Sequence, residues 1–131
     1  MPYVVNQAAN ALTIAERQWF TAGQIRFTGF SSCVGLVVLQ GGQLTAVHLA
    51  QQATDSSWFD TVAAGVVLGL LPIGYTKSIV MGQISTWAFP TGHCVAGYQH
   101  LTGLLTNLTA YQFAEGTYGA DIAGTDIEIT Y

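Results

Sequence analysis

Residues 30–49 read FSSCVGLVVLQGGQLTAVHL, two apolar, β-rich runs on either side of a glycine pair. This pattern predicts a β-hairpin with a two-residue turn at Gly41 and Gly42. With that turn, His48 on the second strand faces Gly35 on the first, whereas a turn placed one residue earlier makes His48 face Cys33. Both registers leave Cys33 and His48 on the same face of the hairpin, because side chains alternate in direction along a strand.

A thiol and an imidazole on one face of a hairpin are a candidate catalytic pair. The Cβ atoms of directly opposed residues lie about 5 Å apart, which would bring Cys33 within reach of His48. A cysteine nucleophile needs such a base, because a free thiol is only a few per cent ionised near neutral pH. A cysteine in an apolar strand is also commonly a small core residue, so a purely structural role is the competing interpretation.

The charge composition argues against one class of function. Only 8% of the 131 residues are charged, the net charge is −4, and the cations are Arg17, Arg26 and Lys77. Three cations cannot form a basic patch, so nucleic acid is not an expected partner. A protein partner would be recognised by shape and apolar contact without electrostatic steering, and the same surface is compatible with a homo-oligomer.

The sequence indicates neither a membrane span nor a signal peptide. The longest apolar run, 62–74, is broken by Pro72 and is shorter than the roughly 20 residues that cross a bilayer. Residues 1–5 lack the charged and apolar regions of a signal peptide. Two cysteines do not make a disulfide scaffold. We therefore expect synthesis in the cytoplasm, with any export following a signal-peptide-independent route.

The remaining pattern predicts an α/β (α+β) fold in which residues 1–131 form a single domain. Strands are expected at 3–5, 24–30, 77–84, 111–113 and 126–131, whereas 8–20 shows no clear period. The hairpin strands are apolar on both faces, which indicates a layer on each side of the sheet. The expected architecture is a layered sandwich built on a mostly antiparallel sheet with two main helices.

Two segments have the periodicity of helices. The first begins near a capping-box pair, Ser57 and Asp60, and ends before Pro72. Its predicted apolar stripe consists of Trp58, Val62, Val66 and Leu70. The second helix is expected over 92–108, and its apolar stripe consists of Cys94, Tyr98, Leu101, Leu105 and Leu108. Cys94 is therefore expected in the core.

The run 29–35 (GFSSCVG), the glycine pair at 41–42 and the segment 46–49 (AVHL) resemble the cysteine-dependent protein glutamine deamidases. This group includes the chemotaxis-receptor deamidase CheD and the catalytic domains of the cytotoxic necrotizing factors. CheD proteins carry a Gly-Leu-Gly-Ser-Cys-Val-Gly run, a glycine pair before the second strand and an Ala-His pair within it. The toxins carry a Leu-Ser-Gly-Cys run followed by a histidine. The order of elements after the hairpin also looks like CheD, so the similarity extends over 24–131.

The resemblance implies a protein glutamine deamidase, which converts a glutamine side chain of a substrate protein to glutamate through a thioester. Because the group includes bacterial toxins, the role of a toxin or effector is also an expectation from the resemblance. It implies Cys33 as the nucleophile and His48 as the base, with the backbone N–H groups of Ser32 and Cys33 binding the oxyanion. The histidine needs an acceptor that orients it, for which Thr28, Ser31 and a backbone carbonyl are the candidates. The resemblance implies no metal and no cofactor.

Two other classes of function fit the same residues. A non-catalytic binding or self-assembling module would account for the high apolar content and the low charge. A cysteine protease or acyltransferase would also use Cys33, although its short separation from His48 differs from the papain-like order.

A second pair, Cys94 and His93, is a poor dyad because adjacent helical residues do not share a face. His93 and His100 lack the carboxylate or thiolate neighbours expected of a zinc site.

Overall fold

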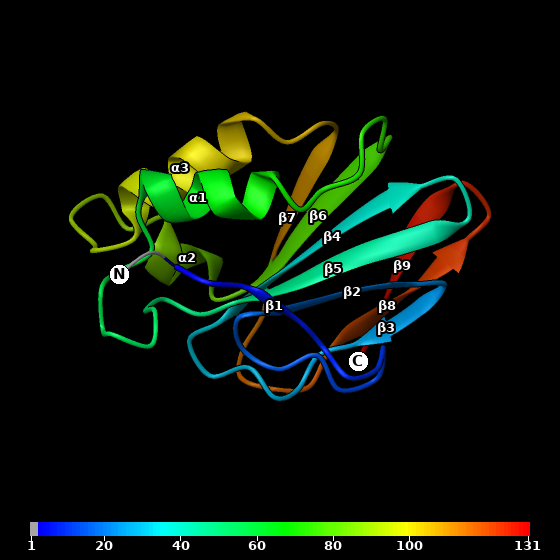
Figure 1. Ribbon diagram of the computed structural model, residues 1–131, viewed down its shortest axis with the longest axis horizontal. Helices are drawn as coiled ribbons and strands as arrows, with labels where there is room; N and C mark the ends of the chain where they lie inside the picture. Colours follow the sequence, from blue (N-terminus) through cyan, green and yellow to red (C-terminus); the bar gives the residue numbers. More distant parts are fainter. Residues whose placement is uncertain (1–2) are drawn as a thin grey trace.

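Two β-sheets with helices packed on one side make up residues 3–131, the part of the chain that the computed structural model describes (Figure 1). The larger sheet consists, in spatial order, of β1 (Asn6–Gln7), β2 (Gln18–Ala22), β5 (Gln43–Leu49), β4 (Val34–Gln40), β6 (Lys77–Gly82) and β7 (Leu108–Gln112). The smaller sheet consists of β3 (Gln24–Arg26), β8 (Gly119–Ala123) and β9 (Asp126–Thr130). The helices are α1 (Thr61–Leu68), α2 (Ile84–Trp87) and α3 (Val95–Gly103). The predicted mixed α/β class is confirmed.

Most neighbouring strands run antiparallel. In the larger sheet, β2 pairs with β5, β5 with β4 and β4 with β6 in antiparallel fashion. The smaller sheet is antiparallel throughout. Only the outermost pairs of the larger sheet, β1 with β2 and β6 with β7, are parallel among the described strands. The prediction of a mostly antiparallel sheet is therefore confirmed.

The predicted hairpin is formed by β4 and β5, at the centre of the larger sheet. Gly35 pairs with His48, so the turn consists of Gly41 and Gly42. The alternative register, in which His48 would face Cys33, is wrong. Gly41 has a φ of 57°, a left-handed conformation that glycine adopts without strain and that hairpin turns of this length require.

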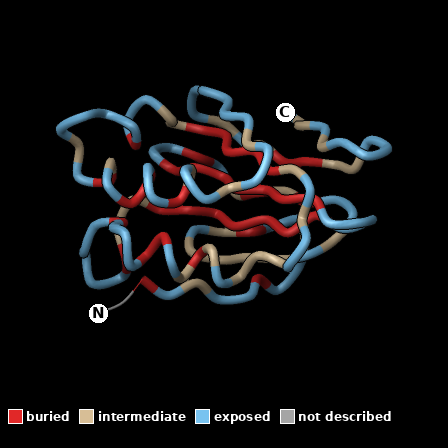
Figure 2. The backbone as a smooth tube through the Cα atoms, turned by 90° about the horizontal axis from the view of Figure 1, so that it is seen from above, coloured by how far each residue is buried: buried red, intermediate tan, exposed pale blue. Residues whose placement is uncertain are grey.

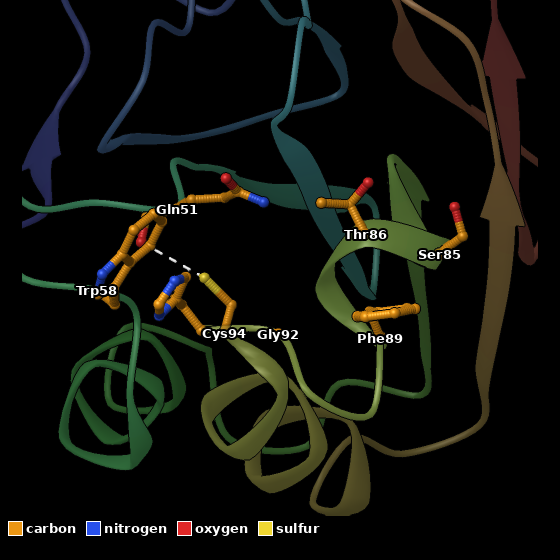
Figure 3. A pocket seen from close by; sticks show the side chains of 8 residues that line it. Gln51, Trp58, Ser85, Thr86, Phe89, Gly92 and Cys94 are labelled. Atoms are coloured by element: carbon orange, nitrogen blue, oxygen red, sulfur yellow. Dashed lines mark hydrogen bonds between the residues drawn. The ribbon is translucent and has the colours of Figure 1, made fainter.

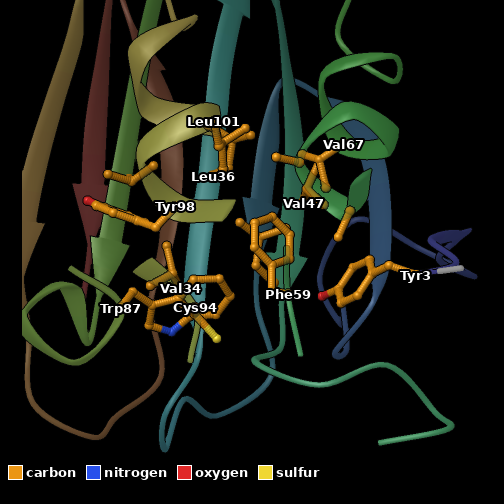
Figure 4. Close-up of a cluster of buried hydrophobic side chains, with 14 of the residues drawn as sticks. Tyr3, Val34, Leu36, Val47, Phe59, Val67, Trp87, Cys94, Tyr98 and Leu101 are labelled. Atoms are coloured by element: carbon orange, nitrogen blue, oxygen red, sulfur yellow. The ribbon is translucent and has the colours of Figure 1, made fainter. Parts of the chain in front are cut away.

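The hairpin separates two hydrophobic cores. On one face Leu36 and Val47 pack beneath α1 and α3, together with the buried rings of Phe59 and Trp87 (Figure 4). On the other face β4 and β5 pack against the smaller sheet, which contributes buried side chains such as Ile25. The buried backbone therefore runs through the middle of the molecule, with exposed loops around it (Figure 2). Two covered faces are what the continuous apolar runs predict.

Helix α1 begins later than the capping-box pattern predicts, because Asp60 and not Ser57 is its N-cap. The Asp60 side chain accepts a hydrogen bond from the Ala63 backbone N–H at 2.9 Å. The buried face of the helix consists of Ala63, Ala64 and Val67. The predicted stripe of Trp58, Val62, Val66 and Leu70 is wrong, since these side chains are exposed or only half-buried.

Helix α3 occupies only the central part of the predicted segment 92–108. It ends at Gly103, and Leu108 already belongs to β7. The predicted burial of Cys94, Tyr98 and Leu101 is confirmed. The alternation predicted for 126–131 appears in β9, where Ile127 and Ile129 pack on the second core. None of the helices in residues 3–131 is long and apolar enough to cross a membrane.

The N-terminal part of the chain is where the sequence prediction differs most from the structure. Residues 3–5 are not a strand, and the pairing begins only at β1. The strand β2 starts within 8–20, the stretch that shows no period, and β8 and the four-residue helix α2 were also not predicted. The predicted strands at 24–30 and 77–84 correspond to β3 and β6, and β7 begins three residues before the strand expected at 111–113.

Candidate active site

Cys33 and His48 lie on the same buried face of the hairpin, as predicted. Cys33 directly precedes β4 and His48 lies within β5, and their side chains are 1% and 0% exposed. The rings of Phe27 and Phe30 stand edge-on to the imidazole, with centroids 5.5 and 4.9 Å away. These rings occupy the space above Gly35, where an added Cβ would meet them at 2.6–2.9 Å. A glycine opposite His48 therefore allows the two rings to cover the imidazole.

The imidazole of His48 is oriented by a backbone carbonyl. Its Nδ1 lies 2.8 Å from the oxygen of Ile14. A carbonyl can only accept, so Nδ1 carries a hydrogen and donates it. Of the candidate acceptors, the backbone carbonyl is the one found, while Thr28 uses its own backbone N–H to reach the same Ile14 oxygen at 3.0 Å. Ser31 lies at the surface, two residues before Cys33 in the chain.

The other ring nitrogen of His48, Nε2, has no hydrogen-bond partner among the described residues, although it is buried. Burial lowers the pKa of His48 below its ordinary value of 6.5, more than the Ile14 hydrogen bond and the Glu16 charge raise it. The ring is therefore neutral near pH 7 and has an unused lone pair on Nε2. Buried polar atoms without partners are uncommon, and a proton-accepting role is one reason to retain one.

The thiol of Cys33 is hydrogen-bonded to a carboxylate that the sequence does not indicate. Its Sγ donates a hydrogen bond to Oε2 of Glu16, 2.9 Å away. Burial first, and then the hydrogen bond and charge of Glu16, raise the pKa of Cys33 from 9.0 to about 12. A backbone hydrogen bond from Ser31 and the charge of Arg17 act in the opposite direction. The thiol is therefore protonated in this arrangement, and it makes no hydrogen bond to His48.

Glu16 reaches Cys33 because the chain turns sharply at the next residue. Arg17 has a φ of 60°, which is uncommon for a residue with a Cβ. Its backbone N–H donates to the His48 carbonyl at 2.7 Å, and its guanidinium donates to the Gln52 carbonyl at 3.1 Å. Nη1 of Arg17 lies 4.0 Å from Oε1 of Glu16, so both charged side chains of this turn lie beside the site. No motif marks Glu16, which belongs to the stretch without a period.

The loop before β4 is held by its carbonyl groups and leaves its amide groups available. The indole Nε1–H of Trp87 donates to the Ser32 carbonyl at 2.8 Å, and the Gln83 N–H donates to the Cys33 carbonyl at 3.2 Å. Within residues 3–131, no hydrogen bond joins the backbone N–H of Ser32 or Cys33 to another group. Gly82, with a φ of 126°, is essential here because a Cβ would collide with the Cys33 carbonyl.

Two pockets adjoin each other near the site, and Ser32 of this loop lines the smaller one. The smaller, of about 190 Å³, is lined mostly by polar residues that include Glu16, Arg17, Ser32 and Gln52. The larger, of about 420 Å³, is lined by Trp58, Ser85, Thr86, Phe89, His93 and Cys94, among others (Figure 3). Gln51 and Trp58 line both. Neither Cys33 nor His48 lines the smaller pocket, because Glu16 lies between the pocket and the thiol.

The second cysteine–histidine pair has a different geometry from the one expected. Cys94 is the N-cap of α3 and does not lie inside the helix, so it lines the larger pocket together with His93. The thiol of Cys94 donates to the Gln51 carbonyl at 3.6 Å, and burial raises its pKa. Within residues 3–131, no group of three or more His, Cys, Asp or Glu side chains is arranged to hold a metal ion.

No family model, no curated protein and no solved structure matches this chain. Its function must therefore be inferred from the geometry of these residues and from the short resemblance in the hairpin.

Proposed function

We propose that the protein is a cysteine-dependent protein glutamine deamidase with a CheD-like arrangement of elements, in which Cys33 is the nucleophile and His48 the base. The observation that carries the proposal is the pairing of His48 Nδ1 with the Ile14 carbonyl, which leaves Nε2 unpartnered on the same buried face as Cys33. A catalytic base requires a fixed tautomer with a free lone pair, and this one has both.

The reaction would form and break a thioester. His48 Nε2 takes the proton of the Cys33 thiol, and the thiolate attacks the carbon of the substrate side-chain amide. The backbone N–H groups of Ser32 and Cys33 bind the resulting oxyanion, each good donor contributing about 3 kcal/mol. His48 returns the proton to the departing ammonia. Water, activated by the same base, then hydrolyses the thioester to glutamate and restores the thiol; an amine in place of water would give transglutamination.

The substrate amide would have to displace Glu16 from Cys33. In the arrangement described above, the carboxylate accepts a hydrogen bond from the thiol, and its charge keeps the thiol protonated. A primary amide has two N–H donors, so it can replace the thiol as the hydrogen-bond donor to Glu16. The thiol is then free to transfer its proton to His48. Glu16 is 47% exposed at its side chain and has room to move toward the smaller pocket.

A non-catalytic binding or assembly module is the second candidate, and one observation favours it. Cys33 is 1% exposed and its pKa is raised to about 12, which is the environment of an inert core cysteine. In that case the bond from Cys33 to Glu16 would serve only to attach the N-terminal segment to the hairpin.

The two candidates are separated by measuring ammonia release from unfolded proteins rich in glutamine, with mass spectrometry of the products. A deamidase releases ammonia and converts glutamine to glutamate, and Cys33→Ala and His48→Gln both abolish this. The control His100→Gln changes an exposed histidine of α3 and retains the wild-type rate. Ammonia release that persists in Cys33→Ala, or its absence from the wild-type protein, refutes the proposal. Cleavage of peptide bonds would instead identify a protease.

A further inference from the structure

We infer that the larger pocket is a specificity site that receives an aromatic side chain close to the target glutamine in an extended segment of the substrate protein. The inference rests on the proposed function, because it assigns the neighbouring smaller pocket to the glutamine itself. It concerns residues that play no part in the thioester chemistry.

The shape and composition of the pocket favour an aromatic occupant. Trp58 and His93 stack with ring centroids 4.3 Å apart and an interplanar angle of 8°. Phe89 lies across the pocket from Trp58 (Figure 3). Trp58 is 39% and Phe89 57% exposed, so large apolar surfaces remain uncovered. A cavity of about 420 Å³ accommodates one large side chain, and ring faces and edges favour contact with another ring.

The absence of acidic and basic side chains from the pocket argues against charged occupants. Among the described residues that line it, none is Asp, Glu, Lys or Arg. An acidic or basic side chain would lose hydration there and find no Asp, Glu, Lys or Arg side chain of opposite charge to offset that cost. The pocket therefore discriminates against acidic and basic residues as well as in favour of rings.

Shared residues connect the pocket to the candidate active site. Gln51 and Trp58 line both pockets, so they form the boundary between them. On the far side of this boundary, Glu16 offers a hydrogen-bond acceptor and Arg17 offers donors. Together they complement the two N–H donors and the carbonyl of a primary amide. An extended segment lying across this boundary would present glutamine to one pocket and a nearby side chain to the other.

The boundary is held in place by its own hydrogen bonds. Gln52 and Trp58 form an isolated β-bridge. The Phe59 N–H donates to the Gln51 carbonyl at 2.7 Å, and the Ala53 N–H donates to the Ser57 carbonyl at 2.8 Å. The pocket is therefore formed before a ligand arrives, which reduces the entropy lost on binding.

The inference is tested with short peptides that carry one glutamine and differ at a single neighbouring position, scanned on both sides, that holds Phe, Ala or Lys. Affinity is measured by calorimetry on Cys33→Ala, which cannot turn over. We expect the best Phe peptide to bind at least about tenfold more tightly than its Ala and Lys counterparts. Trp58→Ala and Phe89→Ala should each remove that preference. The control Tyr131→Ala removes an aromatic ring that is 84% exposed elsewhere and should keep it.

The results separate this inference from the proposed function. Equal affinity for the Phe and Ala peptides at every position overturns the inference, even if the wild-type protein releases ammonia from both. A preference for Phe that Trp58→Ala and Phe89→Ala leave intact overturns it as well. A Phe preference that depends on Trp58 and Phe89, with no ammonia released by the wild-type protein, supports the aromatic site and refutes the deamidase. Because Trp58 belongs to a β-bridge, Phe89→Ala tests the pocket without altering that pairing.

Discussion

The carbonyl oxygen of Ile14 lies 2.8 Å from Nδ1 of His48, so the main chain of one segment determines the proton position on a side chain of another. Ile14 is itself fixed, because its N–H donates to the Arg26 carbonyl and its carbonyl also accepts from the Thr28 N–H, both at 3.0 Å. Two residues further on, Glu16 holds the thiol of Cys33. One short N-terminal segment thus controls the protonation of both members of the candidate pair.

Replacing Glu16 with Gln should make Cys33 more reactive. The substitution removes the charge that raises the pKa of the thiol, while burial continues to hold that pKa above 9.0. Each unit by which the pKa falls raises the thiolate fraction about tenfold, so alkylation by iodoacetamide at mildly alkaline pH should accelerate about tenfold for each unit that Glu16 contributes. Peptide mass spectrometry measures the rate, with Cys94 as the internal reference.

The matched control for this experiment is Glu128→Gln, which removes the same charge from an exposed position of β9. It should leave the alkylation rate of Cys33 at the wild-type value. An equal rate in Glu16→Gln and wild type would show that burial alone protects the thiol.

The stability of the protein should fall as the pH decreases through the range in which free histidine takes up a proton. Burial lowers the pKa of His48 below 6.5, so below that pH the unfolded chain binds a proton that the folded protein does not. The free energy of unfolding should therefore decrease by up to about 1.4 kcal/mol per pH unit below pH 6.5, until the folded-state pKa is reached. Urea titrations between about pH 5 and 8 measure this slope. His48→Gln should reduce it and His100→Gln should not; an unchanged slope in His48→Gln would assign the effect to other groups.

The sequence predicted what depends on local patterning. The glycine pair and the apolar runs defined the hairpin, and the alternation of side chains placed Cys33 and His48 on one face. The acceptor on His48 could not be located, because every residue has a carbonyl and only the tertiary fold determines which one approaches the ring. Glu16 was missed for a related reason: its contact with Cys33 joins segments that are distant in sequence, and no periodicity marks the stretch between 8 and 20. The start of α1 was misplaced because Ser57 and Asp60 are both suitable caps, and only packing distinguishes them.

Trp87→Phe should destabilise the protein and loosen the loop that precedes β4. The substitution removes the hydrogen bond from the indole to the Ser32 carbonyl and part of a fully buried ring. We expect a loss of about 2 kcal/mol in the free energy of unfolding, measured with urea. Amide hydrogen exchange at Phe30 and Gln83, whose N–H groups donate to the Gly116 and Cys33 carbonyls, should accelerate relative to that at Val37 in β4. Uniform acceleration at all three amides would mean that the indole stabilises the fold as a whole and not this loop.

Gly35→Ala should displace the rings that cover His48. The new methyl group would lie within 2.9 Å of atoms of both Phe27 and Phe30, so the rings must shift. We expect a destabilisation of about 1–3 kcal/mol, together with a rise in the pKa of His48 toward 6.5 as water reaches the imidazole. An NMR titration of the His48 ring measures the second effect. Gly42→Ala, which has open space around it, is the control and should change neither quantity; an unaltered His48 titration in Gly35→Ala would show that the rings do not shield the imidazole.

The central position of the hairpin has a consequence for how this protein loses its structure. Because β4 and β5 supply one wall of each core, neither the helical layer nor the smaller sheet can separate without exposing the strand that carries His48. A partly unfolded state that keeps only one of the two cores should therefore have a high free energy. The imidazole should meet bulk water, and the whole chain become accessible to proteases, in the same cooperative transition.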